Sequence, residues 1–325
     1  MSRYALTGAT GFVGGALARR LLATGHRVSA LVRNPGQASD LVDHGATLVA
    51  GELADGAALD ELCNGVEGLF HVAGWYKVGS TDNELAREVN VEGTRAVIDA
   101  VRRAGIPKLV HTSTLAVNSD TGGALVDETY RFSGTHLSAY DFTKAAAHEL
   151  ARAAAASGLP VVTVMPGLVY GPGDTSQTGA LIADVVAGRR PFVPSGGRLS
   201  WAHVDDVADG HVLAMERGVV GEDYMLAGPP ASLAEGLTLV AEICRTRPPR
   251  IIPDAIVGAV GRAAGLLGAV IPAAAGFAES TRAGLASYLG DSTKARTELG
   301  WKCRDLQQGL GETVAAWDAS RRVTE

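Results

Sequence analysis

The sequence predicts an α/β fold, a doubly wound parallel sheet with a smaller C-terminal lobe. In the first half of the chain, short runs of β-branched or aliphatic residues alternate with amphipathic helical stretches, which is the pattern of a parallel sheet covered on both faces. After Pro166 this alternation lapses, and proline and glycine become frequent. We therefore expect residues 1–165 to form the sheet domain, and residues 166–325 to form mainly the second lobe, with returns to the sheet.

The expected strands and helices follow one another in strict alternation. The six strands are expected at 3–7, 27–32, 46–50, 68–72, 108–112 and 161–165. The five helices between them are expected at 13–24, 36–44, 56–64, 83–104 and 138–157. Four helix ends are followed by a glycine, where a left-handed backbone is favoured: Gly25, Gly45, Gly105 and Gly158. Because connections between parallel strands are right-handed, this order predicts a doubly wound sheet.

Composition narrows the class of protein. The net charge of −6 argues against a nucleic acid or an anionic membrane as partner, because both favour a basic protein face. The three cysteines fit no metal-ligand spacing, and the eight histidines contain no His-x-x-x-His pair, so no metal site is expected. The first apolar run begins directly after residues 1–3, so we expect no signal peptide and a cytoplasmic protein.

One apolar stretch, residues 251–278, is long enough to cross a bilayer. Pro253, Asp254, Arg262 and Pro272 interrupt it, so a membrane span is not expected. Two interpretations remain for this stretch. It forms either a helical wall around an apolar ligand pocket or an apolar interface between subunits.

A glycine-rich turn follows the first expected strand directly and opens the first expected helix. Gly8, Gly11 and Gly14 have the spacing G-x-x-G-x-x-G. Gly8 would permit the tight turn, Gly11 the close approach of backbone to a pyrophosphate, and Gly14 the close packing of helix on strand. The helix N-terminus would supply amides and a positive dipole to the anion, so residues 1–165 are expected to bind a dinucleotide. The other residues of the turn expected at the cofactor are Thr10, Phe12 and Val13.

The end of the second expected strand bears on the choice of cofactor. It carries Arg33 and Asn34, without the carboxylate that binds the ribose 2′-hydroxyl in many NAD sites. An arginine suits the 2′-phosphate of NADP, because it can neutralise the phosphate charge through paired hydrogen bonds. A solvated loop residue is the alternative interpretation of Arg33. The sequence therefore predicts a preference for NADP(H), with NAD as the alternative.

Tyr140 and Lys144 lie four residues apart in the expected helix 138–157, so both side chains should lie on one helix face. A Tyr-x-x-x-Lys pair on its own can arise by accident. A free tyrosine has a pKa of about 10, and a lysine cation one turn away favours the phenolate. The pair therefore indicates a group that transfers a proton to or from a substrate oxygen.

With the glycine turn and this pair, the chain resembles the extended branch of the short-chain dehydrogenase/reductase superfamily, the NAD-dependent epimerase/dehydratase family. The resemblance covers nearly the whole chain and is strongest to dihydroflavonol-4-reductase-like and hopanoid-associated sugar-epimerase-like members. Further family motifs occur in the family's order, namely HVAG (71–74), NVEGT (90–94), HTSTLAV (111–117), PGLVYGPGD (166–174), HVDDVADG (203–210) and DSTKARTELGW (291–301).

The resemblance implies hydride transfer at a nicotinamide, with Tyr140 as the acid/base and Lys144 holding the nicotinamide ribose. The family's serine position falls on Thr114, which would hydrogen-bond the substrate oxygen; Ser113 is the alternative, because successive strand residues face opposite ways. Asn90 would order a water or backbone near the cofactor, or cap a helix turn. The resemblance also places these residues along the cofactor: Glu52, Leu53, Val72, Ala73, Gly74, Pro166, Gly167 and Val169.

Local departures from the family pattern bear on the reaction. Family dehydratases carry an Asp-Glu pair where this chain has Leu115 and Ala116, which disfavours elimination. Residues 196–206, GGRLSWAHVDD, lack the Arg-Asp-aromatic run of sugar-nucleotide enzymes. Together with the apolar stretch 251–278, these features favour an NADP(H)-dependent oxidoreductase that acts on a mainly apolar ketone or secondary alcohol.

Two other functions stay open from the sequence. One is a nucleotide-sugar epimerase that retains NAD(P), and the other is a non-catalytic dinucleotide sensor. The resemblance also implies a homodimer formed through two helices, one of them the helix with Tyr140.

Overall fold

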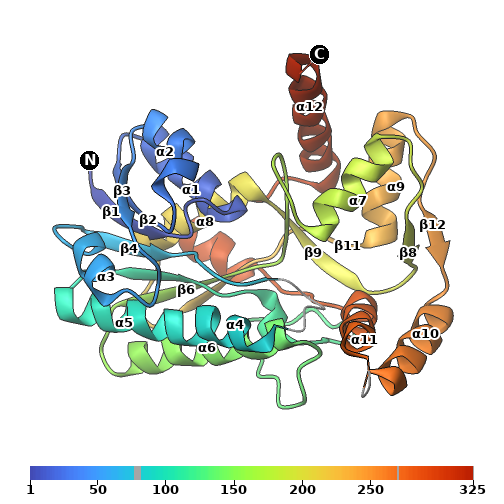
Figure 1. Cartoon of the computed structure of the whole chain (residues 1–325), viewed down its shortest axis with the longest axis horizontal. Helices are drawn as coiled ribbons and strands as arrows, with labels where there is room; N and C mark the ends of the chain where they lie inside the picture. Colours follow the sequence, from blue (N-terminus) through green and yellow to red (C-terminus); the bar gives the residue numbers. More distant parts are fainter. Residues whose placement is uncertain (77–81, 269–270, 325) are drawn as a thin grey trace.

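A seven-stranded parallel sheet forms the centre of the chain (Figure 1). The computed structural model describes residues 1–76, 82–268 and 271–324. The strand order is β10-β6-β5-β4-β1-β2-β3, and every neighbouring pair is parallel. The strands are β1 (Arg3–Thr7), β2 (Arg27–Val32), β3 (Thr47–Ala50), β4 (Gly68–His71), β5 (Leu109–Thr112), β6 (Val161–Pro166) and β10 (Asp223–Leu226). The fold prediction is confirmed, and each of the six expected strands is within one residue of its expected ends.

Helices cover both faces of this sheet (Figure 1). One face packs against α1 and α8 through residues such as Leu6 and Phe70, and the other packs against α3, α5 and α6 through Ala5 and Leu69. Neighbouring residues thus enter opposite cores, as the pleat requires. The helices of this domain are α1 (Phe12–Ala23), α2 (Ser39–Asp43), α3 (Gly56–Leu62), α4 (Asn83–Arg87), α5 (Gly93–Ala104), α6 (Ala139–Ala156) and α8 (Val204–Arg217).

Two expected helices are interrupted. The helix expected at 83–104 consists of α4, a π-helical turn at Glu88–Glu92, and α5. The helix expected at 36–44 is reduced to a 3-10 turn at Pro35–Gln37 followed by the short α2, because the Asn34 side chain accepts a hydrogen bond from Gly36 N and starts a separate turn. The expectation for the four glycines is confirmed, since Gly25, Gly45, Gly105 and Gly158 all have φ between +61° and +95°.

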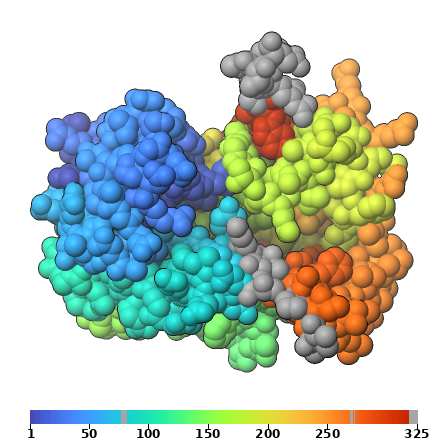
Figure 2. All heavy atoms as spheres, viewed as in Figure 1, coloured from blue at the N-terminus to red at the C-terminus, as the bar shows by residue number. Residues whose placement is uncertain are grey.

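The C-terminal lobe is built around two small sheets. The first contains β7 (Leu168–Tyr170), β9 (Arg198–His203) and β11 (Pro230–Ser232), and the second contains β8 (Phe192–Pro194) and β12 (Arg250–Ile252). The helices of this lobe are α7 (Gln177–Val186), α9 (Leu233–Cys244), α10 (Asp254–Leu267), α11 (Pro272–Leu285) and α12 (Leu306–Thr324). Two elements from this half of the chain, helix α8 and strand β10, belong instead to the large sheet. The lobe stands beside the sheet domain, and the space-filling view shows a hollow where they meet (Figure 2).

The apolar stretch 251–278 forms β12, α10 and the start of α11. Among the residues that the structure describes, no helix has both the length and the hydropathy needed to span a bilayer. The large side chains of this stretch face outward, including Ile256, Leu267 and Phe277. The interpretation of the stretch as a pocket wall is therefore wrong for these side chains.

The glycine turn gives a sharp test of this packing. An added Cβ at Gly14 would lie 2.1 Å from Gly8 O, a backbone atom that cannot move aside, whereas one at Gly15 would be 3.4 Å from its nearest neighbours. Gly14→Ala should therefore lower the free energy of unfolding by about 2 kcal/mol or more. Gly15→Ala should leave it unchanged or raise it by up to about 1 kcal/mol, because alanine favours the helix.

Urea unfolding of the two single variants beside the wild type measures this difference. Equal stabilities of Gly14→Ala and Gly15→Ala would show that the turn does not press against α1 as described.

Candidate active site

The glycine turn lies where the strand order of the sheet reverses, between β1 and β4, which is the position at which doubly wound folds bind ligands. Gly8 has φ +77°, and a Cβ there would lie 2.6 Å from Ala73 N. The turn therefore contacts the backbone that follows β4 directly. Gly11 is the N-cap of α1 and contributes no side-chain cap, and the first turn of α1 contains no acidic residue. The glycine turn fits a pyrophosphate, because the first amides of a helix lack partners within the helix and the N-terminus of α1 is the positive end of its dipole.

Tyr140 and Lys144 lie on the first turns of α6, whose N-cap is Ser138. Lys144 is buried, and its Nζ donates a hydrogen bond to Thr112 O at 2.7 Å. The same Nζ is 3.8 Å from the position that a Cβ on Gly74 would occupy. Gly74 directly follows the residues that contact Gly8, so the pair and the glycine turn lie at the same edge of the sheet.

Thr114 and Ser113 point in opposite directions. The Thr114 side chain hydrogen-bonds the Tyr140 hydroxyl. Ser113 Oγ is instead 2.8 Å from His148 Nδ1, and Ser113 is 3% exposed. Only Thr114 therefore shares a contact with Tyr140, and the geometry does not support Ser113 as the alternative donor to substrate.

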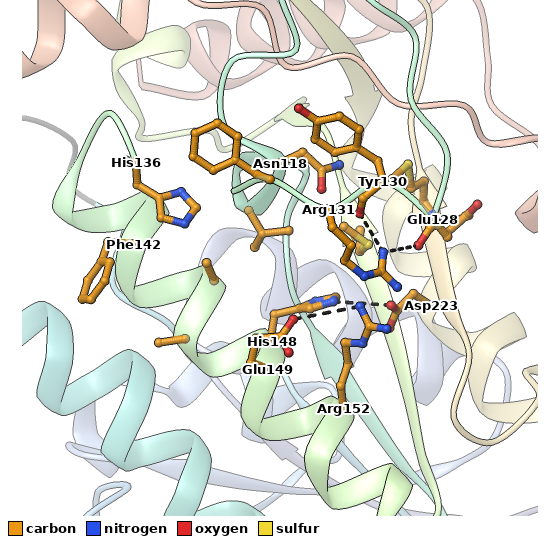
Figure 3. A pocket seen from close by; sticks show the side chains of 16 residues that line it. Asn118, Glu128, Tyr130, Arg131, His136, Phe142, His148, Glu149, Arg152 and Asp223 are labelled. Atoms are coloured by element: carbon orange, nitrogen blue, oxygen red, sulfur yellow. Dashed lines mark hydrogen bonds and ion pairs between the residues drawn. The ribbon is translucent and has the colours of Figure 1, made fainter. Parts of the chain in front are cut away.

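His148 links Ser113 to a cavity behind α6 (Figure 3). His148 Nε2 is 3.4 Å from Asp223 Oδ2, and both side chains line a cavity of about 330 Å³ together with Asn118 and Phe142. The Asn118 Nδ2 atom is buried and has no hydrogen-bond partner among the described residues. Tyr140 and Lys144 do not line this cavity, so it is separate from the cofactor side of α6.

Asn90 holds the backbone beside the cofactor strand. Its Oδ1 accepts a hydrogen bond from Trp75 N at 2.7 Å, and its Nδ2 donates to Trp75 O and to Thr143 Oγ1, both at 3.0 Å. It lies inside the π-helical turn that breaks the expected helix. The expectation of a helix cap is therefore wrong, and the side chain orders backbone instead. Because its amide is engaged in these contacts, a direct role in holding the cofactor is not supported.

Burial dominates the electrostatics of the pair. It raises the pKa of Tyr140 to about 12, against the opposing effect of the Thr114 hydrogen bond, and the Asp141 carboxylate adds to the rise. Burial lowers the pKa of Lys144 to about 8. The lowering of the phenol pKa expected from Lys144 is therefore not what the protein alone produces, because desolvation of the phenolate is the largest influence on Tyr140 and raises its pKa.

Two histidines beneath Lys144 remain uncharged. Burial, with a contribution from the Lys144 cation, lowers the pKa of His71 to about 3 and that of His111 well below its ordinary value. His71 lies between Thr7 Oγ1 at 2.8 Å and Thr94 Oγ1 at 3.0 Å. His71 is thus neutral and hydrogen-bonded, whereas His111 is neutral and neither of its ring nitrogens has a hydrogen-bond partner among the described residues.

The remaining residues expected at the cofactor are distributed along the same edge of the sheet. Arg33 is exposed directly after β2, and Glu52 is exposed just after β3. Leu53 packs on Gly93, where an added Cβ would meet its Cδ1 at 2.6 Å. Gly167 is needed for another contact, because its Cβ would lie 2.1 Å from Ser200 O on β9. Of the others, Thr10 lies in the turn, Phe12 and Val13 begin α1, Val72 directly follows β4, Pro166 ends β6, and Val169 lies in β7.

Asp141 ties the catalytic helix to the C-terminal lobe, and the sequence analysis did not single it out. It is 2% exposed, and it accepts hydrogen bonds from Ser138 Oγ at 2.8 Å and from Tyr288 Oη at 3.1 Å. Tyr288 N also donates to Arg198 O on β9. A carboxylate directly after Tyr140, in an otherwise alanine-rich helix, was the available signal for Asp141. Nothing in the sequence pairs it with Tyr288, which is far away in the chain.

A family model decides the identity of this arrangement. Residues 4–227 match the NAD dependent epimerase/dehydratase family. The chain belongs to this family. It is an NAD(P)-dependent oxidoreductase of the extended short-chain dehydrogenase/reductase type, as the sequence motifs predicted.

Individual relatives cover nearly the whole chain. A 4-hydroxy-2-methyl-3-oxo-4-farnesyl-3,4-dihydroquinoline-1-oxide ketoreductase of Stigmatella aurantiaca is 36% identical and covers 95% of this chain and 94% of its own length. Sterol demethylase protein B of Methylococcus capsulatus is 34% identical over 76% of each chain. The crystal structure of gox2253 superposes with a TM-score of 0.86 at 32% identity, covering 99% of both chains. A UDP-glucose 4-epimerase of Thermotoga maritima, 19% identical with a TM-score of 0.81 over 99% of this chain and 100% of its own, shares the fold.

The burial of Asp141 predicts how stability depends on pH. Its pKa is raised to about 6 from an ordinary value of about 3.9, so between these values the folded chain holds a proton that the unfolded chain has lost. Stability should therefore fall as the pH rises from about 4 to about 7, by about 3 kcal/mol from this group. Asp141→Asn does not titrate, so its stability relative to the wild type should rise by about that amount over the same interval.

Urea unfolding of both proteins at the two pH values measures the effect. Tyr288→Phe provides the second comparison, because the Tyr288 hydrogen bond lowers the pKa of Asp141; its removal should move the loss of stability to higher pH. If the free energies of unfolding of Asp141→Asn and wild type differ by the same amount at both pH values, the burial of this carboxyl is contradicted.

Proposed function

We propose that the protein is an NADPH-dependent reductase of mainly apolar ketones, acting also on the corresponding secondary alcohols in reverse. The observation that carries the proposal is the chain of contacts at the start of α6. Thr114 bonds Tyr140, and Lys144 of the same helix lies beside Gly74, next to the backbone on which the glycine turn packs. These contacts join an oxygen-binding hydroxyl, a proton donor and a cofactor cradle at one edge of the sheet.

In this proposal each residue has a separate task. The Thr114 hydroxyl and the Tyr140 hydroxyl together bind the substrate carbonyl oxygen, and Tyr140 gives it a proton as negative charge develops there. Lys144 uses one of its N–H groups on Thr112 O, and its two others are assigned to the nicotinamide ribose. The nicotinamide, when bound, supplies the hydride to the carbonyl carbon. Asn90 keeps the Trp75 backbone in place beside this site.

The protonation state of Tyr140 supports the direction of reduction. A phenol with a pKa of about 12 is protonated at neutral pH, and reduction of a ketone requires a proton donor at this position. Asp141 contributes to this state, because its charge raises the pKa of its neighbour.

The substrate class is supported by the relatives and by the site. The printed names of the relatives describe a ketoreductase for a farnesylated quinoline oxide, a sterol demethylase protein, a ceramide reductase and a 2-alkyl-3-oxoalkanoate reductase. All four names describe molecules with long or fused apolar parts. In this chain Leu115 and Ala116 stand where family dehydratases carry an Asp-Glu pair, and Leu115 is buried in an apolar cluster with Val117 and Met165. These features together favour a lipophilic ketone as the substrate.

The family motif also suggests the assembly. We propose a homodimer formed through α5 and α6, which is consistent with the exposure of Phe142 on the outer side of α6. Light scattering that gives the mass of a monomer at micromolar concentration would contradict this assembly.

The reaction is tested by its cofactor balance. With a lipophilic ketone as substrate, one NADPH should be consumed for each alcohol formed. Tyr140→Phe should lower kcat by a factor of about 10³, and Thr114→Ala by about 10² to 10³ because one donor to the developing oxyanion is lost. NADPH binding, followed by fluorescence, should persist in both variants.

Ser113→Ala is the matched control, since it removes the neighbouring hydroxyl that faces His148. Its kcat should remain within a few-fold of wild type. Interconversion of sugar nucleotides without net use of cofactor would replace the proposal with an epimerase. NADPH binding without turnover of any ketone, unaffected by Tyr140→Phe, would indicate a dinucleotide sensor.

The preference for NADPH is assigned to Arg33, which is exposed after β2 and can reach outward to a 2′-phosphate. Arg33→Ala should lower kcat/KM for NADPH by about tenfold to a hundredfold, the effect of one charge-assisted bond, and should leave kcat/KM for NADH unchanged. Arg27→Ala, at the opposite end of the same strand and also exposed, is the control and should change neither. A wild type that prefers NADH tenfold would exclude this role of Arg33.

A further inference from the structure

The α10–α11 hairpin presents its large apolar side chains to solvent. Six of them are between 48% and 84% exposed, and these are Ile256, Val260, Leu266, Leu267, Ile271 and Phe277. Ile256, Val260 and Leu267 share one stripe of α10, because they are spaced i, i+4 and i+11. Phe192 on β8 and Ile251 on β12, at the base of α10, are also exposed. The hairpin forms one corner of the molecule, coloured orange in Figure 2.

Glycines on the inner side of α10 explain this arrangement. A Cβ added to Gly261 would lie 2.3 Å from Thr281 Oγ1, and one added to Gly268 would lie 3.0 Å from Ala275 Cα. Cβ atoms at Gly258 and Gly265 would also face α11, at 3.7 Å from Leu285 Cδ1 and 3.8 Å from Ala278 Cβ. The two helices therefore pack through small residues, and α10 has its large apolar residues on the outside.

The charge of this region is opposite to that of the whole chain. Residues 245–285 carry five arginines and two acids, a net charge of +3, whereas the chain has −6. All five arginines are exposed: Arg245, Arg247, Arg250, Arg262 and Arg282. The two acids are half-buried; Asp254 accepts hydrogen bonds from Ser195 Oγ and Gly196 N, and Glu279 interacts electrostatically with Asp141. Three of these arginines precede α10, and the hairpin itself, Asp254–Leu285, carries two arginines and two acids, so the positive excess lies on β12 and the segment before it, next to the exposed Phe192 and Ile251.

We propose that the outer face of the α10–α11 hairpin docks reversibly on an anionic lipid surface. Exposed aliphatic and aromatic side chains bordered by arginines are the combination that inserts at the boundary of headgroups and acyl chains. The expectation of no anionic membrane partner came from the net charge of the whole chain, which does not describe this face. The docking is peripheral, through side chains of one hairpin.

The hairpin is connected to the active site through the segment that follows α11. Tyr288, three residues after α11, bonds Asp141 beside Tyr140. A lipophilic ketone dissolved in a bilayer would be close to an enzyme that is docked on the same surface. This link to catalysis rests on the proposed function, whereas the docking itself does not.

Co-sedimentation of the full-length protein with vesicles tests the docking without any substrate. The wild type should bind vesicles of phosphatidylcholine with phosphatidylglycerol, and about tenfold more weakly vesicles of phosphatidylcholine alone, because several arginines contribute. Replacing Ile256 and Leu267 together by serine should weaken binding by about tenfold or more, since two apolar side chains no longer insert. The matched control replaces Val219 and Val220, which are also exposed but lie between α8 and β10, and should bind as wild type.

Circular dichroism melting confirms that both double variants fold. A third double variant, Arg262→Gln with Arg282→Gln, leaves the exposed apolar side chains intact and should remove the preference for vesicles with phosphatidylglycerol. Absence of wild-type binding, or an equal loss in both double variants, would overturn the proposal. A halved mass of the Ile256→Ser and Leu267→Ser protein, with vesicle binding unchanged, would assign the face to a second copy of the chain instead. NADPH turnover of a water-soluble ketone, measured on the same samples, separates failure of docking from failure of the proposed reaction.

Discussion

The structure of the site depends on one close backbone contact, between the glycine turn after β1 and the chain that follows β4. A Cβ on Gly8 would collide with Ala73 N at 2.6 Å, so the contact exists only because glycine stands there. It fixes the start of α1 against the sheet and positions Gly74, the next residue, beside Lys144. The glycine turn and the pair Tyr140 and Lys144 are thereby held in a fixed relative position, so that neither can move without the other.

Helix α6 connects this site to two other parts of the molecule. Its cofactor side carries Tyr140 and Lys144, while its other side carries His148, which joins Ser113 to Asp223. Asp141 extends from the same first turn to Tyr288 of the C-terminal lobe. A buried carboxyl is costly unless it is hydrogen-bonded, so its retention here ties the position of the lobe to that of the acid/base. The C-terminal lobe and the helix that carries Tyr140 are in this way mechanically connected.

Much of the site could be anticipated because its geometry follows from spacing within single elements. The interval between Tyr140 and Lys144 is one helical turn, and the glycine spacing belongs to one strand-helix turn. The choice between Thr114 and Ser113 could not be made in this way, because alternation along a strand says that two residues diverge but not which one faces the cofactor. The pKa of Tyr140 was also misjudged, since the lysine one turn away is visible in the sequence while the burial that raises this pKa is not.

The sequence by itself determined six of the seven strands with their ends, the left-handed glycines and the family, because these depend on patterns of residues close together in the chain. Only the tertiary structure decided the partners of Asn90 and Asp141, and the outward orientation of the apolar face of α10. Those outcomes depend on contacts between different elements of the fold: Trp75 for Asn90, Tyr288 for Asp141, and the small residues of α11 for the glycines of α10. A one-dimensional pattern shows that a side chain is apolar or charged, but packing in three dimensions decides what it meets.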